Sequence, residues 1–230
     1  MATNLEKEAM SSRPTRLPRD QRRIQLLDAA SEVFASKGYH AAAMDEIADA
    51  AGVSKPVLYQ HFPSKLELYL ALLDQSCDRL VEVLEEALSS TDDNANRVNA
   101  TVAAFFEFVS STSGDFRFVF ESDLTGENAV QQRLARVNHE ISGAIADVIT
   151  EDTSLPRPQA KLLAVSLVGI AQVSARYWIS GGTSAITLDE AKHLVSNLAW
   201  RGISGFPLTE HERRITPDGR QADPLAGSSS

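Results

Sequence analysis

The sequence predicts an all-α protein of about nine helices: an N-terminal three-helix helix-turn-helix domain followed by a larger helical domain. Three observations predict this. Apolar residues recur at helical spacing along most of the chain, whereas the alternation typical of strands is almost absent. Residues 44–69 divide into short helical segments around a glycine turn. The chain has 230 residues, 43% of them hydrophobic, which is enough to bury a substantial core.

The first predicted helix spans Arg19–Lys37 and ends at Gly38. One face of this helix is apolar and is expected to be buried; it carries Ile24, Leu27, Ala30 and Phe34.

A short second helix, Met44–Ala51, is followed by Gly52, which supplies the positive φ that ends such a helix. Ser54 is placed to cap the next helix through its hydroxyl, and Pro56 suits that helix's first turn. The third helix, Lys55–Phe62, is too short to be stable alone in water, so neighbouring helices must hold it.

The outer face of this third helix carries no carboxylate, and this is typical of a recognition helix that enters the DNA major groove. A plain αα-hairpin inside a helical bundle is the alternative on pattern alone. Charge favours DNA: residues 13–23 hold five arginines and one acid, and residues 1–65 carry a net +1 within a chain of −9. We expect residues 1–18 to form a flexible basic arm that meets DNA, the alternative being a solvated leader.

A capping box, Ser64 to Glu67, opens a long helix that reaches about Ser89 and links the DNA-binding domain to the body. The apolar stripe of this helix places Cys77 on the buried side, as an inert core thiol. A single cysteine excludes an intramolecular disulfide framework. The stripe consists of Leu66, Leu70, Leu73, Cys77, Leu80 and Leu84.

The body is predicted to contain helices at Ala95–Ser111 and Glu127–Thr150, with a short segment at 115–122 between them. The next helix, Gln159–Ser180, is apolar on nearly every side and must be covered on every side. A second capping box, Thr187 to Glu190, opens a last helix that ends near Gly205. We expect these last two helices to form a two-fold homodimer interface; a single central core helix is the alternative.

Three motifs lie in the N-terminal region: F-x-x-K-G-Y at Phe34–Tyr39, D-E-I-A-x-x-A-G-V-S at Asp45–Ser54, and L-Y-x-H-F-x-S-K at Leu58–Lys65. Through them residues 19–70 resemble the DNA-binding domain of the TetR family of transcriptional regulators. Ala43 and Met44 stand where this family often has threonine, so a hydroxyl–phosphate contact is not expected there.

Further segments, including LPRDQRR, SKPVLYQHFPSKLELYLA and the later ARYW at Ala175–Trp178, are similar to the FasR-type regulators of fatty-acid synthase genes. This resemblance implies a homodimer on a palindromic double-stranded DNA operator, controlled by a long-chain acyl-CoA in an apolar tunnel and needing no cofactor. A TetR-type regulator of efflux or other metabolic genes, responding to a different hydrophobic small molecule, is the alternative.

For DNA, we expect base contacts from the start of the recognition helix and phosphate contacts around it. The residues expected at bases are Ser54, Lys55, Pro56 and Val57, and those expected at phosphates are Tyr59, His61 and Lys65, joined by Arg16 and Arg19 of the basic region.

Six of the nine phenylalanines lie between residues 105 and 120, where they indicate either ordinary core packing or a ligand cavity between helices. The expected ligand contacts are Phe105, Phe106, Phe116, Phe120, Leu124, Ile141, Ile145, Val173 and Arg176. The cations considered for a CoA head group are Arg117, Arg133, Arg136 and Arg176.

No catalytic or metal-binding motif occurs, and the five histidines are scattered, so we expect neither an enzyme nor a metal site. The charge-free apolar stretch Leu162–Ala175 is shorter than the roughly 20 residues that span a bilayer, which favours a soluble, cytoplasmic protein. The expected organisation is an arm at 1–18, a DNA-binding domain at 19–66, a ligand-binding and dimerisation domain at 67–206, and a disordered tail at 207–230.

Overall fold

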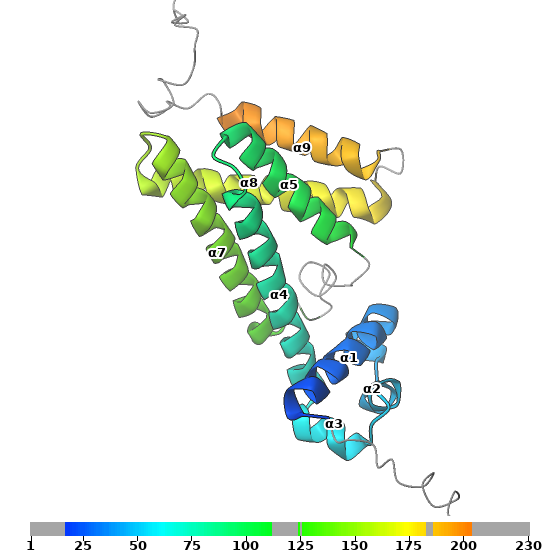
Figure 1. Ribbon diagram of the computed structural model, residues 1–230. Helices are drawn as coiled ribbons and strands as arrows, with labels where there is room; N and C mark the ends of the chain where they lie inside the picture. Colours follow the sequence, from blue (N-terminus) through cyan, green and yellow to red (C-terminus); the bar gives the residue numbers. More distant parts are fainter. Residues whose placement is uncertain (1–16, 112–123, 125, 183–185, 204–230) are drawn as a thin grey trace, which may run out of the picture.

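The computed structural model describes residues 17–111, 124, 126–182 and 186–203. Within these residues the chain forms eight α-helices and a π-helical turn, without a strand, so the all-α prediction is confirmed. The three N-terminal helices form one group, and the other helices form a bundle (Figure 1). The predicted segment at 115–122 and the predicted tail lie outside the described residues.

The N-terminal group contains α1 (Arg19–Ala41), α2 (Met44–Ala50) and α3 (Lys55–His61). Gly38 interrupts α1 with a φ of 76°, where the sequence predicts the helix end, but helical residues continue to Ala41. Ile24 does not join the core as predicted: it is 58% exposed, and the buried face of α1 begins only at Leu26. The buried face consists of Leu26, Leu27, Ala29, Ala30 and Phe34.

The turn between α2 and α3 has the predicted glycine geometry, since Gly52 has a φ of 63°. Ser54 is the N-cap of α3, but its side chain makes no capping hydrogen bond, so the prediction of hydroxyl capping is wrong. The short α3 is instead held by burial: Leu58 is fully buried, and Phe62, which follows the helix, is 2% exposed.

Helix α4 (Lys65–Ser89) joins the N-terminal group to the bundle (Figure 1). The Ser64 hydroxyl accepts a hydrogen bond of 3.1 Å from the Glu67 amide and so caps the helix. The buried face of α4 includes Cys77, and burial raises the pKa of this thiol to about 12, which leaves it inert at neutral pH. One continuous cluster of buried residues runs from α1 along α4 into the bundle.

Three aromatic rings join α1 to α4. The Tyr39 ring lies 5.9 Å from the Phe34 ring and 5.2 Å from the Tyr69 ring, and Phe34 and Tyr69 meet edge to face at 5.5 Å. Such aromatic pairs stabilise a contact beyond the area that they bury. The first turns of α4 are therefore fixed to the end of α1.

The bundle consists of α5 (Asn94–Ser110), α7 (Asn128–Asp152), α8 (Arg157–Tyr177) and α9 (Leu188–Ile203), with a π-helical turn, Trp178–Gly182, after α8. Helix α7 packs against both α4 and α8. The predicted capping box of α9 is present, since Thr187 and Glu190 exchange hydrogen bonds between backbone and side chain.

Helix α8 has three apolar sides, and each lies in a different environment. Ala160 and Ala164 are fully buried in a small core cluster with α7, and Val168 packs against the main core. The third side is open in the single chain: Leu162 and Val173 are each 69% exposed. By length and composition, Arg157–Gly181 is apolar enough to cross a membrane, contrary to the expectation from its charge-free stretch alone.

We expect Gly52→Ala to lower the free energy of unfolding by about 1 kcal/mol, measured by urea denaturation. No atom lies within 4 Å of the position where a Cβ would be, so the cost comes from the positive φ alone. Gly52→Asn should cost less, because asparagine tolerates this region better. As a control with the opposite effect, Gly143→Ala inside α7 should raise the free energy of unfolding by about 0.5–1 kcal/mol. Equal effects of the alanine and asparagine variants at position 52 would contradict the argument.

Candidate DNA-binding surface and ligand cavity

The predicted base-contacting residues lie together on one surface. Ser54, Lys55 and Pro56 are exposed at the start of α3, and Val57 is half-buried beside them. Tyr59 is 40% exposed one turn further along the helix. Since Leu58 fills the core behind them, the buried side of α3 fixes which side chains face outward.

Lys55 has an intramolecular partner on this surface. Its ammonium lies 2.7 Å from the carboxylate of Asp45 on α2, and this hydrogen bond raises the pKa of Lys55. Both side chains are more than half exposed, so water and salt screen the pair. Such a pair can exchange for a DNA contact at little cost.

Arginines surround the end of the recognition helix. The Arg23 guanidinium lies 4.4 Å above the centre of the Phe62 ring. Burial lowers the pKa of His61, and the positive charges of Arg19, Arg23 and Arg22 lower it further. This corner is therefore electropositive, as a phosphate-binding surface must be. Arg16 lies outside the described residues.

Lys65 is placed differently from the expectation. Its ammonium donates to the carbonyl oxygens of Tyr39 at 2.8 Å, His40 at 3.3 Å and Ala42 at 2.9 Å, and it lies 4.6 Å from the centre of the Tyr39 ring. An ammonium has three N–H donors, and these contacts use all of them. Lys65 thus binds the carbonyl groups at the end of α1, which leaves it no free donor for a phosphate.

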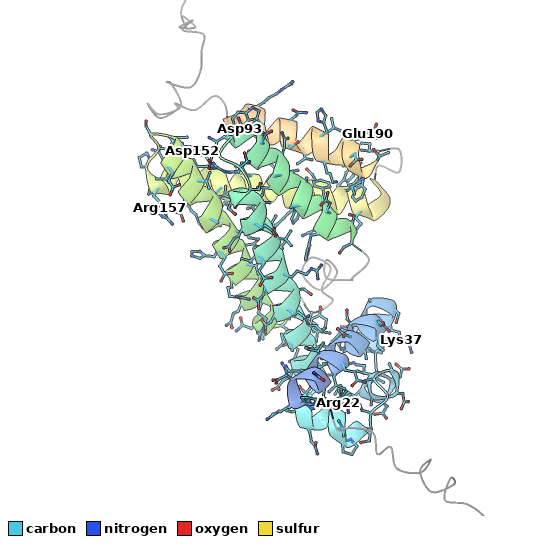
Figure 2. The ribbon with its side chains drawn as sticks, viewed as in Figure 1. Arg22, Lys37, Asp93, Asp152, Arg157 and Glu190 are labelled. Carbon is cyan, nitrogen blue, oxygen red and sulfur yellow. The ribbon has the colours of Figure 1, made fainter. Side chains whose placement is uncertain are left out.

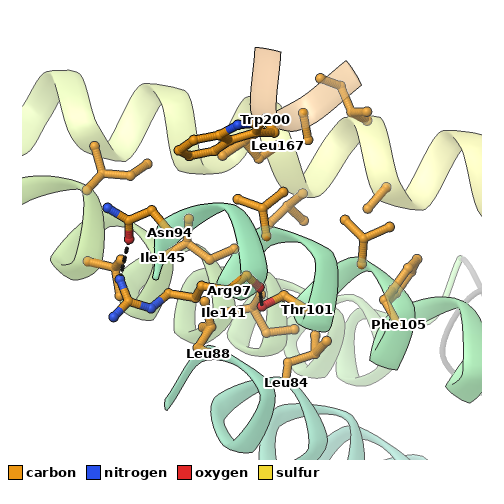
Figure 3. Close-up of a pocket in the computed structure, with 18 of the residues that line it drawn as sticks. Leu84, Leu88, Asn94, Arg97, Thr101, Phe105, Ile141, Ile145, Leu167 and Trp200 are labelled. Atoms are coloured by element: carbon orange, nitrogen blue, oxygen red, sulfur yellow. Dashed lines mark hydrogen bonds between the residues drawn. The ribbon is translucent and has the colours of Figure 1, made fainter. Parts of the chain in front are cut away.

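A cavity of about 120 Å³ lies inside the bundle, between α4, α5, α7, α8 and α9 (Figure 3). This volume is roughly ten times the space that one buried water requires. Its walls are mainly aliphatic and aromatic, a composition typical of sites for apolar small molecules. The lining includes Leu84, Leu88, Val98, Val102, Phe105, Ile141, Ile145, Leu167, Val168 and Trp200.

Three of the predicted ligand contacts, Phe105, Ile141 and Ile145, line this cavity. Phe106 and Leu124 are buried in the core, outside the lining, and the Phe106 ring lies 6.1 Å from that of Trp178. Val173 and Arg176 do not line this cavity: both are exposed, because α8 turns this part of its surface outward. Phe116 and Phe120 lie outside the described residues.

Most of the polar lining of the cavity lies where α5 begins and α7 ends, although Gln172 of α8 also lines the cavity and donates to Asn138 at 2.7 Å. Arg97 forms an ion pair of 2.9 Å with Asp152 and donates a 2.5 Å hydrogen bond to Asn94. The Thr101 hydroxyl donates to the Arg97 carbonyl, one turn earlier in α5. The hydroxyl of Thr153, which directly follows α7, donates to the Ile149 carbonyl. Because these groups are already hydrogen-bonded within the protein, they do not require a polar ligand.

Arg97 was not predicted, because a lone arginine in an amphipathic helix carries no signal of its partner. The arginines considered for a head group are placed elsewhere: Arg133 pairs with Asp74 at 2.7 Å and Arg136 with Asp78 at 2.8 Å, joining α7 to α4. Arg117 lies outside the described residues.

Two family descriptions match the chain. Residues 26–72 match the bacterial regulatory proteins of the tetR family, and residues 95–202 match the tetracyclin repressor-like C-terminal domain. The chain is 49% identical over 197 residues to the HTH-type transcriptional activator FasR of Mycolicibacterium smegmatis, a match that covers 86% of this chain and 90% of the relative.

Solved structures share the fold. A TetR-like transcriptional regulator from Rhodococcus sp. RHA1 is 30% identical, with a TM-score of 0.64, over 83% of this chain and all of that chain. FadR from Bacillus subtilis, solved in complex with stearoyl-CoA, has a TM-score of 0.63 at 19% identity over 76% of this chain and 96% of its own.

We expect Lys65→Met to lower the free energy of unfolding by about 1–3 kcal/mol, because carbonyl groups at the end of α1 lose a charged donor. The salt dependence of DNA binding by the folded protein should stay as in the wild type. Lys37→Met removes only the exposed pair with Glu46 and should cost less than about 1 kcal/mol in the same thermal or urea unfolding measurement. A reduced salt slope with normal stability would restore the phosphate role for Lys65.

Arg19→Gln provides the contrasting result. Arg19 is exposed at the start of α1 and makes no hydrogen bond or ion pair with the other described residues. If its charge meets a phosphate, the variant should fold normally, bind all DNA sequences more weakly, and show a salt slope reduced by about one in a fluorescence-anisotropy titration. A wild-type slope would show that Arg19 is not at a phosphate.

Proposed function

Since the chain belongs to the TetR family of DNA-binding transcriptional regulators, we propose that it binds a palindromic operator as a homodimer under the control of a long-chain acyl-CoA. The family makes the protein a regulator and not an enzyme. The observation that carries the acyl-CoA proposal is the apolar cavity. Its wall includes Leu84 and Leu88 of α4, the helix that also enters the N-terminal group of α1, α2 and α3, called the DNA-binding group from here on.

The DNA contact follows from the exposed face of α3. Ser54, Lys55 and Pro56 enter the major groove and read base edges, while Tyr59, His61 and Arg19 lie toward phosphates. Lys55 exchanges its exposed ion pair with Asp45 for a hydrogen bond to a base edge in the groove. Because DNA is the partner, the expected place of action is the cytoplasm.

A second copy of the chain covers the open side of α8 in this proposal. Leu162, Val165 and Val173 lie along one side of α8, and Leu194 and Leu198 of the adjacent α9 are 58% and 61% exposed. Exposed apolar surface of this kind is costly in water and typical of an isologous interface. Gly169 within the stripe has open space before it, which permits two helices to approach closely.

An acyl chain suits the cavity because its walls offer apolar contact along several helices. Burial of a methylene contributes about 0.8 kcal/mol, so a chain of sixteen carbons has far more binding energy available than micromolar affinity requires. The fold is able to hold such a ligand, as the Bacillus subtilis regulator with stearoyl-CoA demonstrates for itself. The identity with the activator FasR supports a lipid-responsive activator of fatty-acid synthase genes.

Coupling between ligand and DNA requires that the ligand bind the DNA-competent and DNA-incompetent states with different affinity. In the proposed mechanism, a chain that enters the cavity displaces Leu84 and Leu88 and so tilts α4. Lys65 and Tyr69, at the other end of α4, carry this tilt to α1. The two recognition helices then depart from the roughly 34 Å spacing of operator half-sites, and operator affinity falls.

The dimer is tested by Leu198→Asp, which places a charge in the proposed apolar interface and should yield monomers at micromolar concentration in analytical ultracentrifugation. Ile24→Asp is the matched control, because Ile24 is similarly exposed, at 58%, but lies on α1. The control should remain a dimer. A wild type that sediments as a monomer would exclude the dimer altogether.

The effector is tested with an operator duplex selected from a random library and acyl-CoAs of increasing chain length. Long-chain acyl-CoA should raise the operator Kd about tenfold or more, whereas free CoA should have no effect. Ile145→Trp fills the cavity and should abolish the response, and Ala135→Trp on the exposed side of α7 should preserve it. Release that ignores chain length would leave instead a regulator of efflux or other metabolic genes that responds to another hydrophobic molecule.

A further inference from the structure

The cavity is most polar at a partly exposed end, where α5 begins and α7 ends. Arg97 and Asp152, which meet there, have side chains 15% and 29% exposed, whereas Phe105 and Ile141 are each 5% exposed. Asn94 and Arg97 lie at one end of the residues drawn in Figure 3, and Phe105 lies at the other. Polarity and exposure both identify the Arg97 end as the mouth, through which the head of an amphipathic ligand faces water.

The position of the mouth in the fold agrees with this orientation. Asp93, which caps α5, and Asp152, which ends α7, lie near each other at the end of the bundle that is remote from α1, α2 and α3 (Figure 2). A ligand that enters here keeps its head away from the DNA-binding group and extends its chain inward along α5 and α7.

Arg97 retains one donor group at this mouth. Its Nε donates to the Thr91 carbonyl at 3.2 Å, and its Nη1 donates to Asn94 and Asp152. Its Nη2 makes no hydrogen bond with any other described residue. Arg97 can therefore donate from Nη2 to a ligand oxygen without breaking its ion pair with Asp152.

The neighbouring carboxylate of Asp152 determines which kind of ligand oxygen can bind to Arg97. Asp152 already neutralises Arg97, so a free fatty acid would place a second carboxylate beside the first in a half-buried site, where like charges repel strongly. An uncharged acyl carbonyl, as in a thioester or an ester, meets no such repulsion and still accepts a hydrogen bond.

We infer that the Arg97–Asp152 pair selects the head group of the ligand, accepting an uncharged acyl carbonyl and rejecting a free carboxylate, with Asp152 as the specificity-determining residue. This inference rests on the proposed function. The Arg97–Asp152 pair also joins α5 to α7. If that structural role were its only role, replacing Asp152 would change the stability of the protein but not its preference between charged and uncharged ligands.

The test compares S-palmitoyl-N-acetylcysteamine, an uncharged thioester, with palmitate at pH 8, below the concentrations at which either forms micelles. Binding is followed by tryptophan fluorescence, since Trp200 lines the cavity. The wild type should bind the thioester about tenfold or more tightly than palmitate. In Asp152→Asn, which removes the charge and keeps an oxygen for Arg97, palmitate affinity should rise until the ratio is below about threefold.

Asp147→Asn is the matched control. Asp147 lies on the same helix and pairs with Arg157 in an exposed position outside the cavity lining, so this variant should keep the wild-type ratio. An unchanged ratio in Asp152→Asn, with thioester binding intact, would overturn this inference alone. Failure of the wild type to bind either acyl compound would overturn the proposed acyl ligand and this inference with it.

Discussion

The structure depends on the continuity of α4. This one helix contributes Leu68 and Tyr69 to the core of the DNA-binding group and Leu84 to the wall of the cavity, and the buried cluster along it is not interrupted. A hydrogen-bonded helix resists bending far more than a loop does, so displacement at one end reaches the other. The first turn is held by Lys65 on the carbonyl groups at the end of α1, and the middle is held by Arg133 and Arg136 on Asp74 and Asp78.

In the proposed function, this arrangement allows an apolar cavity remote from DNA to influence DNA binding. The cavity is enclosed by five helices, and α4 is the one among them that also enters the DNA-binding group. The ion pairs between α4 and α7 are partly exposed, so they guide the packing of the two helices without locking it. In the proposed coupling, the close-packed helices move as units when a ligand changes the space between them, and the joint at Tyr39 and Tyr69 is where that movement would meet α1.

Helix α8 illustrates how one segment serves three environments. Its alanines permit close contact with α7, its leucine and valine at 167 and 168 face the cavity, and its outer stripe remains exposed in the single chain. By length and composition alone, the same helix is apolar enough to cross a membrane. In the proposed dimer a second copy of the chain covers this stripe, and hydrophobicity alone does not distinguish a protein partner from a membrane.

The sequence by itself determined the helices, the glycine turn at Gly52, and the caps at Ser64 and Thr187, because these depend on residues within one or two turns of each other. It also determined which face of α3 is exposed, since Leu58 and Phe62 supply a short buried side. Tertiary structure alone decided the partner of Lys65, 23 to 26 residues away, and the pairing of Arg97 with Asp152, 55 residues away. It likewise decided that Val173 faces outward, because a helix that is apolar all round contains no pattern to mark its inner side.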